Sequence, residues 1–207
     1  LGWSYDNRYM VQANFRADAY DTSKLDPTNR WGYFPSVSGG WTLSNEKFMS
    51  GVKDKIGLTF LKLRASWGVN GNVNAMGDYQ YSDVLVANNN NGYNFTDNEG
   101  RTVGVGPSGV LPNPKIKWET SRQVDLGVDM RFFNERLSFS LDWYNKNTND
   151  LITSTTAPAN TGSTTTYINA GKVNNHGTEI ELSWKDSRGD FSYSISGNLA
   201  TLHNKVL

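Results

Sequence analysis

The chain has 207 residues, equal numbers of acidic and basic side chains, and no cysteine. Zero net charge argues against a nucleic-acid surface, which needs clustered lysine and arginine. The absence of cysteine excludes disulfides and cysteine-based zinc sites. No apolar run approaches the roughly 18 residues of a transmembrane helix. Aromatic residues make up 13% of the chain, which fits the girdles of a membrane β-barrel or a glycan-binding β-sandwich.

The first third of the chain predicts three strands. Residues that alternate between apolar and polar form three segments, at 9–20, 32–43 and 58–69. The polar stretch 21–30 separates the first two, and Pro27 prevents a continued ladder there. Residues 44–49 predict a short helical turn with Ser44 or Asn45 as its cap.

A long irregular segment follows, from residue 70 to residue 118. Residues 79–87 predict one short extra strand inside it. A compact soluble domain seldom carries so long a connection without regular structure. The segment therefore favours a fold with large surface loops.

Residues 112–151 carry the clearest pattern, two long strands around a turn at 133–136. A soluble strand averages about 5–6 residues, whereas a tilted membrane-spanning strand needs about 9–11. One face holds Arg122, Val124, Leu126, Val128, Met130, Phe132, Leu137, Phe139, Leu141 and Trp143. The other holds Gln123, Asp125, Gly127, Asp129, Arg131, Ser138, Ser140, Asp142 and Tyr144.

The last third of the chain predicts two more long strands. A polar loop at 149–166 leads to a strand over 167–185, on which Glu179 and Glu181 share a face. A tight turn at 187–190 precedes the final alternating segment, which begins at Phe191. Long and short connections alternate along the chain, so every long loop leaves the sheet at the same end, as in outer-membrane barrels.

The predicted fold is all-β: a fragment of a large antiparallel transmembrane β-barrel. It has at least seven long strands, long external loops and short periplasmic turns, and residues 1–207 all lie inside the barrel domain. The turn at 133–136 is expected to be periplasmic. The side chains expected to face lipid are Val124, Leu126, Val128, Leu137, Phe139 and Leu141, with Trp143, Trp184, Phe132 and Phe191 as girdle or lipid contacts, while Gln123, Asp125 and Asp129 face the lumen.

Six stretches resemble the SusC/RagA-type TonB-dependent outer-membrane transporters. They are NRWGYFPSVSGGW (29–41), FLKLRASWGVNGN (60–72), LPNPKIKWETSRQVDLGVD (111–129), RLSFSLDWYNKNTNDL (136–151), NAGKVNNHGTEIEL (169–182) and FSYSISGNLATLHNKVL (191–207). Their order and spacing match the family and cover nearly the whole chain, which makes the combination far more specific than any single stretch.

The resemblance implies import of glycans, oligosaccharides or peptides across the outer membrane of a Gram-negative bacterium. It also implies energy supplied through TonB and a SusD-like surface lipoprotein over the external loops. The sequence offers no convergent set of acid, base and nucleophile, so no enzymatic activity and no cofactor are expected. The signal peptide, the carboxypeptidase-like N-terminal domain, the TonB box, the plug and the last strands of the family have no counterpart in the sequence. The chain therefore corresponds to part of the C-terminal half of the barrel, which alone neither closes a pore nor couples to TonB.

Aromatic residues near the longest loop are the candidate substrate contacts. Tyr93, Phe95 and Trp118 could stack on sugar rings, although an interface anchor is the favoured role for Trp118. Glu179 and Glu181 fit a charged pore wall better than a glycosidase pair, which normally comes from separate elements flanking a cleft.

The remaining polar clusters lack the spacing of known sites. His176 and His203 are far apart in sequence, so hydrogen-bonded or solvated imidazoles are expected instead of metal ligands. Asp97, Glu99 and the 88–91 asparagine run offer oxygen ligands for calcium without a known loop spacing. Gly104, Gly106 and Gly109 do not follow a strand and open a helix, which argues against a phosphate loop. A secreted glycan-binding β-sandwich stays as the alternative fold, and it would be soluble without detergent.

Overall fold

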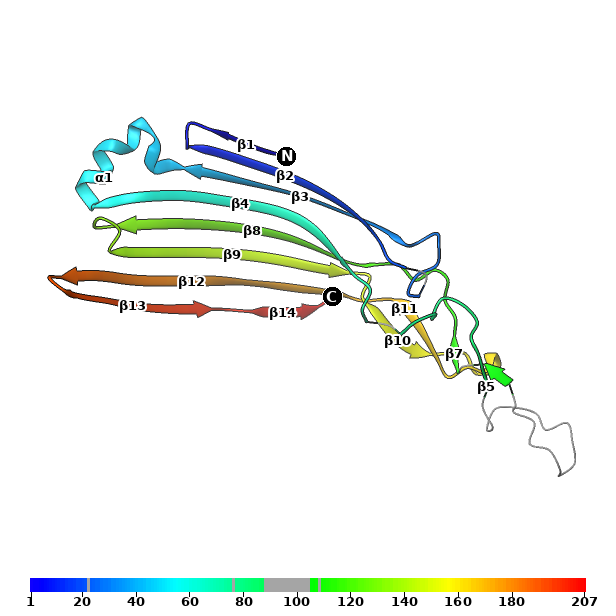
Figure 1. Ribbon diagram of the computed structural model, residues 1–207. Helices are drawn as coiled ribbons and strands as arrows, with labels where there is room; N and C mark the ends of the chain where they lie inside the picture. The colour runs from blue at the N-terminus through cyan, green and yellow to red at the C-terminus, as the bar shows by residue number, and fades with distance from the viewer. Residues whose placement is uncertain (22, 76, 88–104, 108) are drawn as a thin grey trace, which may run out of the picture.

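The structure is a computed structural model that describes residues 1–21, 23–75, 77–87, 105–107 and 109–207. About half of the chain forms one curved antiparallel sheet of nine strands (Figure 1). In spatial order the strands are β1 (Gly2–Tyr5), β2 (Tyr9–Ala19), β3 (Trp31–Thr42), β4 (Leu58–Asn72), β8 (Glu119–Phe132), β9 (Leu137–Asn149), β12 (Lys172–Arg188) and β13 (Phe191–Ala200), with β14 (His203–Val206) also paired to β12. The predicted array of at least seven long antiparallel strands is confirmed.

The connections are sorted between the two ends of the sheet, as the sequence predicts. At one end, here called the loop end, β7 (Val110–Leu111), β10 (Ile152–Thr156) and β11 (Thr165–Asn169) form a small sheet, and β5 (Leu85–Ala87) pairs with β6 (Val105–Pro107). At the opposite end, the turn end, lie the helix α1 (Ser50–Ile56) and the tight hairpin turns (Figure 1). None of the described helices is long and apolar enough to cross a bilayer.

The sheet has one apolar and one polar face, because its registers keep like side chains together. Val128 lies opposite Leu63 and Leu141, while Asp129 lies opposite Lys62 and Ser140. In the described part of the chain, no second sheet covers the apolar face: Leu126 is 50% exposed and Phe15 is 69% exposed. A β-sandwich buries such a face between two sheets, so the structure favours the barrel wall over the sandwich.

The hydrophobic core sits outside the large sheet, among the connections of the loop end. Leu25, Val73, Ile116 and Ile152 bury their side chains against one another, and Tyr20, Trp118 and Tyr167 pack around them. These residues come from the three connections between β2 and β3, β4 and β8, and β9 and β12, so the loops hold each other in place.

The turn end is held by aromatic rings and one carboxylate. Glu46 accepts hydrogen bonds from the Tyr9 hydroxyl (2.6 Å), the Trp41 indole N–H (3.0 Å) and Arg8 Nη1 (3.0 Å). These donors, Tyr9 above all, hold the pKa of Glu46 below its usual range. In the turn after β8, Phe133 adopts a left-handed backbone with φ of 55°, and its ring packs against Trp184.

Three local predictions need correction. The helical turn starts near its expected place but consists of two 3-10 turns, Leu43–Asn45 and Lys47–Met49, followed by α1. Neither Ser44 nor Asn45 caps it with a side-chain hydrogen bond, because Asn45 donates instead to the Asn7 carbonyl (3.0 Å).

The two other corrections concern strand limits. The expected strand over 167–185 is divided into β11 and β12, because Gly171 adopts a left-handed backbone with φ of 93°. Inside the extra strand expected at 79–87, only Leu85–Ala87 is extended and paired.

Candidate functional site

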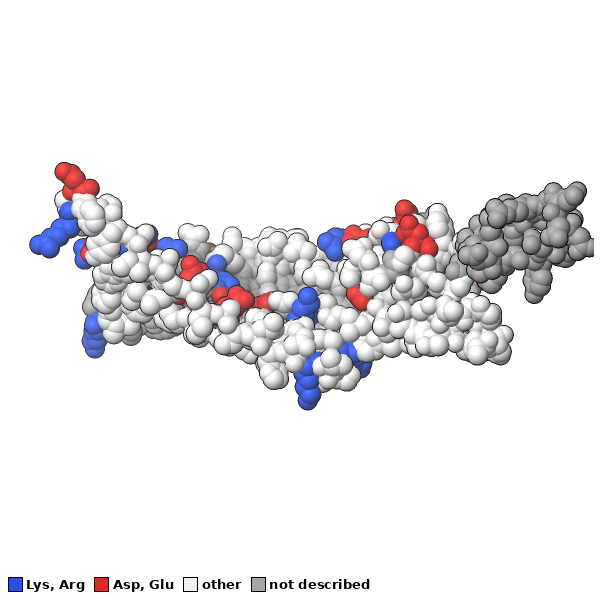
Figure 2. Space-filling view, turned by 90° about the horizontal axis from the view of Figure 1, so that it is seen from below, with Lys and Arg blue, Asp and Glu red and all other residues white. Residues whose placement is uncertain are grey.

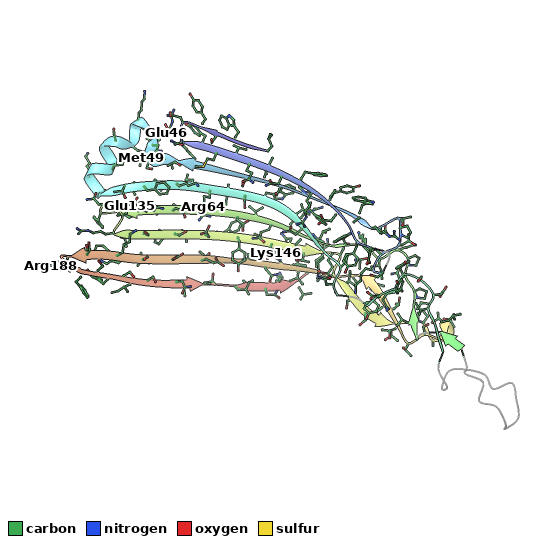
Figure 3. All side chains as sticks on the ribbon, viewed as in Figure 1. Glu46, Met49, Arg64, Glu135, Lys146 and Arg188 are labelled. Atoms are coloured by element: carbon green, nitrogen blue, oxygen red, sulfur yellow. The ribbon has the colours of Figure 1, made fainter. Side chains whose placement is uncertain are left out.

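A charged network occupies the middle of the polar face. The guanidinium of Arg64, on β4, donates to both carboxylate oxygens of Asp129 (2.7 and 3.0 Å) and to Asp142 (3.0 Å), two strands away on β9. Ser140 donates to Asp129 at 3.0 Å. Figure 3 places Arg64 midway along the sheet. A fork of this kind fixes three adjacent strands in register through charge-assisted hydrogen bonds.

A glycine makes this network possible. Gly127 lies between Arg64 and Asp142 in the same cross-strand row. A Cβ at Gly127 would clash with Asp142 Oδ1 and stand 2.8 Å from Arg64 Cζ. The missing side chain therefore lets the arginine reach over β8 to the next strand.

The network belongs to an acidic area of the polar face. Three neighbouring rows across β4, β8, β9 and β12 contain five carboxylates, Asp125, Asp129, Asp142, Glu179 and Glu181, and two cations, Lys62 and Arg64. Asp125 accepts hydrogen bonds from Ser66 (2.8 Å) and Gln123 (2.6 Å). Glu179 and Glu181 lie on the face predicted for them and are exposed. We call this area the acidic wall.

At the loop end, one buried glutamate joins the wall to the loops. Glu119 is 7% exposed and begins β8. Its carboxylate accepts a hydrogen bond from Asn72 Nδ2 at the end of β4 (2.7 Å) and another from the backbone N–H of Ile152 at the start of β10 (2.8 Å). The Glu119 side chain, on β8, thus joins the start of β10 to the end of β4.

Two asparagines fasten the neighbouring loops by their side chains. Asn169 accepts from the Lys117 N–H and donates to the carbonyls of Lys117 and Asp150, each at 2.9 Å. Asn113 donates to the Tyr167 carbonyl at 2.8 Å. Both residues stand in the stretches quoted for the family resemblance, and their hydrogen bonds give those stretches a physical role in ordering the loops.

Trp118 lies at the base of the loops. Its ring meets Phe34 and Tyr20 edge-on, and its indole N–H donates to the Arg30 carbonyl at 3.0 Å. A Cβ at Gly32 or Gly71 would collide with the Phe34 ring, so these glycines make room for the pair. The other candidate residues, Tyr93, Phe95, Asp97, Glu99, Gly104 and the 88–91 run, lie outside the described residues.

The two histidines are neighbours in space. His176 on β12 and His203 on β14 are register partners with ring centroids 5.0 Å apart, and His176 Nδ1 lies 2.7 Å from Asn174 Oδ1. The described residues contain no cluster of three or more residues suited to hold a metal ion. The sequence did not predict this contact, because only the pairing of β12 with β14 brings the two histidines together.

The fold and the faces of the sheet identify the class of protein. A model of a family described as TonB dependent receptor-like, beta-barrel matches residues 1–206. The chain belongs to this family of TonB-dependent receptor-like β-barrels.

The relatives are SusC-like, which confirms the resemblance found in the sequence. The chain is 33% identical over its whole length to the TonB-dependent receptor SusC of Bacteroides thetaiotaomicron, and 32% identical to the TonB-dependent receptor P39 of Formosa agariphila. A solved structure of the RagAB peptide transporter is 26% identical and superposes with a TM-score of 0.82 over 99% of this chain. The chain spans 20% of the length of SusC and 19% of the length of P39. It spans 21% of the matching chain in the RagAB structure.

Proposed function

We propose that this chain forms part of the wall and the external loops of an outer-membrane importer that takes up an oligosaccharide or a peptide with energy from TonB. The observation that supports this most is the position of the ordered loops at one end of the sheet (Figure 1), while the acidic wall lies further along the polar face of the same strands. Substrate arriving from outside would meet the loops first and then the polar face. The apolar face would contact lipid.

One neighbour favours the peptide class. RagAB is named as a peptide transporter, whereas the name of SusC gives only a TonB-dependent receptor. We infer that residues 1–207 belong to the C-terminal half of the barrel and that a SusD-like lipoprotein closes over the loop end. Tyr93 and Phe95 are our candidates for stacking on the substrate, with Trp118 as the third.

The test uses the full-length protein that contains this chain, produced in its own cells. We expect the protein in the outer-membrane fraction, and we expect uptake of labelled oligosaccharide or peptide to stop when TonB is deleted. Comparing uptake of the labelled oligosaccharide with uptake of the labelled peptide identifies the substrate class. Recovery of the full-length protein only as a soluble periplasmic species would contradict the proposal.

The aromatic candidates need a separate comparison. Tyr93→Ala and Phe95→Ala should weaken substrate uptake without lowering the amount of protein in the membrane, because a stacked ring is worth about 0.5–1.5 kcal/mol beyond the area it buries. Tyr79→Ala is the matched control, since Tyr79 is an exposed ring in the same long connection. Equal uptake by all three variants would remove Tyr93 and Phe95 from the substrate site.

A further inference from the structure

Two histidines lie side by side on the sheet, and neither takes part in the Arg64 network or the core of the loops. His176 on β12 and His203 on β14 are register partners with ring centroids 5.0 Å apart. His176 is partly buried and His203 is exposed. Glu179 stands three residues from His176 along β12, so the pair occupies the face of the sheet opposite the acidic wall.

The separation of the two rings suits a shared metal ion. A zinc ion lies about 2.0–2.1 Å from an imidazole nitrogen, and two imidazoles bound at about 90–110° to each other then have centroids roughly 4.5–5.2 Å apart. The observed 5.0 Å falls within that interval. The pairing of β12 with β14 therefore sets the spacing in advance, and rotation about the side-chain torsions is enough to direct both nitrogens at one point.

Asn174 determines which nitrogen of His176 is free to bind. Asn174 Oδ1 lies 2.7 Å from His176 Nδ1. A carbonyl oxygen only accepts, so Nδ1 carries the proton and Nε2 keeps its lone pair. The amide is oriented from its other end, where Nδ2 donates to Asn147 Oδ1 at 2.8 Å and to Asn145 Oδ1. Histidine ligands of metal ions donate their second ring N–H to a carbonyl or carboxylate in the same way.

The ring of His203 is available as the second ligand. Among the described residues, its nitrogens have no hydrogen bond and no ion pair. Because the side chain is exposed, it can turn toward Nε2 of His176 without breaking a contact of its own. The pair therefore offers two ring nitrogens from adjacent strands.

The surroundings of the pair decide which metal ion it suits. Its register neighbours on the same face are Asn145, Asn147, Asn174 and Lys205, and none of them is acidic. Blue side chains project from the lower margin of the molecule near its middle, without red ones beside them on that margin (Figure 2). Ca²⁺ and Mg²⁺ bind through oxygen ligands, chiefly carboxylates, so the pair suits them poorly. Imidazole suits zinc, nickel and copper, and affinity among the divalent ions is highest for Cu²⁺.

We propose that His176 and His203 bind a late first-row divalent metal ion, Cu²⁺ most tightly, through Nε2 of His176 and one ring nitrogen of His203. Water would occupy the remaining positions, in the tetragonal nitrogen and oxygen geometry that Cu²⁺ accepts. The ion would join β12 to β14 and stabilise the folded protein by mass action. Asn174 is the positioning residue. The metal site does not depend on the transported substrate or on TonB.

The test uses the full-length protein, purified in detergent and treated with a chelator. Thermal midpoints are measured as Cu²⁺, Ni²⁺ or Mg²⁺ is added. The site variants are His176→Gln and His203→Gln. The control is Asn204→Gln, which changes the next residue of β14 on the opposite face, where Asn204 donates to Asn175.

We expect Cu²⁺ to raise the midpoint of the wild type and of the control until the site is saturated. Ni²⁺ should act only at higher concentration and Mg²⁺ not at all. Both histidine variants should lose the saturable shift, and His203→Gln should keep the metal-free midpoint of the wild type because His203 is exposed. Electron paramagnetic resonance of the bound Cu²⁺ should show coupling to two imidazole nitrogens in the wild type and not in the variants.

Asn174 separates a prepared site from two histidines that are merely close. Asn174→Leu should raise the Cu²⁺ concentration needed for half of the shift about 10–100-fold, as the loss of an outer-shell partner does. Asn174→Asp loses the donations to Asn145 and Asn147 but keeps an acceptor for Nδ1, so it should bind Cu²⁺ at least as tightly as the wild type.

A saturable Cu²⁺ shift in either histidine variant, or an equal shift with Mg²⁺, would overturn the metal site. An unchanged response of Asn174→Leu would overturn the assignment of Nε2 as the ligand of His176. Both results leave TonB-dependent uptake as a separate measurement, so the metal site and the proposed importer can fail independently.

Discussion

Arg64 reaches across two strand spacings, and its neighbours determine whether it can do so. Its guanidinium is bound at both ends, by Asp129 on β8 and by Asp142 on β9, while Gly127 leaves the path between them open. Each carboxylate accepts from the same cation, so a change in one contact affects the other. The network is therefore sensitive to small changes in volume.

Gly127→Ala should displace the arginine from Asp142. The added Cβ would stand 2.8 Å from Arg64 Cζ, and overpacking of this kind costs about 1–3 kcal/mol. The thermal midpoint of the full-length protein in detergent should fall. Gly197→Ala is the matched control, because nothing lies within 4 Å of its added Cβ. Equal midpoints for the two variants would show that the arginine path has spare room.

Glu46 predicts an acid-dependent stability at the turn end. Its three donors lower the pKa of the folded carboxyl below the unfolded value of about 4.3. The carboxylate therefore stabilises the fold fully above that pH, and the contribution disappears as the pH falls through the folded pKa. The gap in thermal midpoint between wild type and Glu46→Gln should be constant from pH 7 to pH 5 and close below about pH 4.3.

The control for Glu46 is Glu135→Gln in the turn after β8. Among the described residues, Glu135 is paired only with Arg131, at 3.2 Å, and both side chains are about half exposed. Exposed pairs contribute about 0–1 kcal/mol, so this variant should melt close to the wild type at every pH. A gap for Glu46→Gln that persists unchanged at pH 3 would exclude the charge of Glu46 as its cause.

At the level of the elements, the position of β10 depends on β8, a strand with which it is not paired. The buried Glu119 is the acceptor for the Ile152 N–H at the start of β10. Glu119→Ala would leave that N–H and Asn72 without their acceptor, which costs about 1–3 kcal/mol for a buried group. We expect faster hydrogen exchange at Ile152 and faster proteolysis of residues 153–164.

The comparison for β10 is Glu135→Ala, which removes an exposed glutamate from the opposite end of the sheet. Cleavage of the external loops in this variant should match the wild type. If Glu119→Ala is also cleaved at the wild-type rate, the loop cluster is held by its hydrophobic core alone.

The strands were predictable from the sequence, because apolar and polar residues that alternate with a period of two are specific to a strand with one apolar and one polar face. The faces of the 112–151 hairpin are confirmed, as is the sorting of long and short connections. The break at Gly171 was not predictable, since a glycine inside an alternating run fits a strand equally well. The Arg64 network, the Glu119 contact and the pairing of His176 with His203 depend on registers between distant strands, which no local pattern specifies.

At the level of the whole molecule, the exposed apolar face demands a lipid environment. Val128 lies in the middle of the apolar run of β8. Val128→Arg should cost roughly 2–4 kcal/mol, as for a cation near mid-bilayer on a barrel's lipid face. The amount of folded full-length protein in the outer membrane should drop. Gln123→Arg places the same side chain on the polar face beside Asp125, and its yield should stay near wild type.

Residues 1–207 alone should not form a dispersed monomer in water. The apolar face is uncovered in the described part of the chain, and β1 and β13 form edges of the sheet. Unpaired edges and large apolar patches lead to aggregation. Light scattering should report large particles without detergent and a smaller species with it. A monodisperse monomer in plain buffer would contradict the exposed apolar face.

The loop end contains a hydrophobic core of its own, built from Leu25, Val73, Ile116 and Ile152. The long connection leaves this core at Val73 and returns to it at Ile116, so its two ends are anchored close together whatever lies between them. A connection anchored in this way behaves as an exchangeable cassette. Segments 74–108 from SusC-like relatives could be transplanted onto the same barrel with β7 and Asn113 left in place. The selectivity of the proposed importer could then be changed without redesigning its wall.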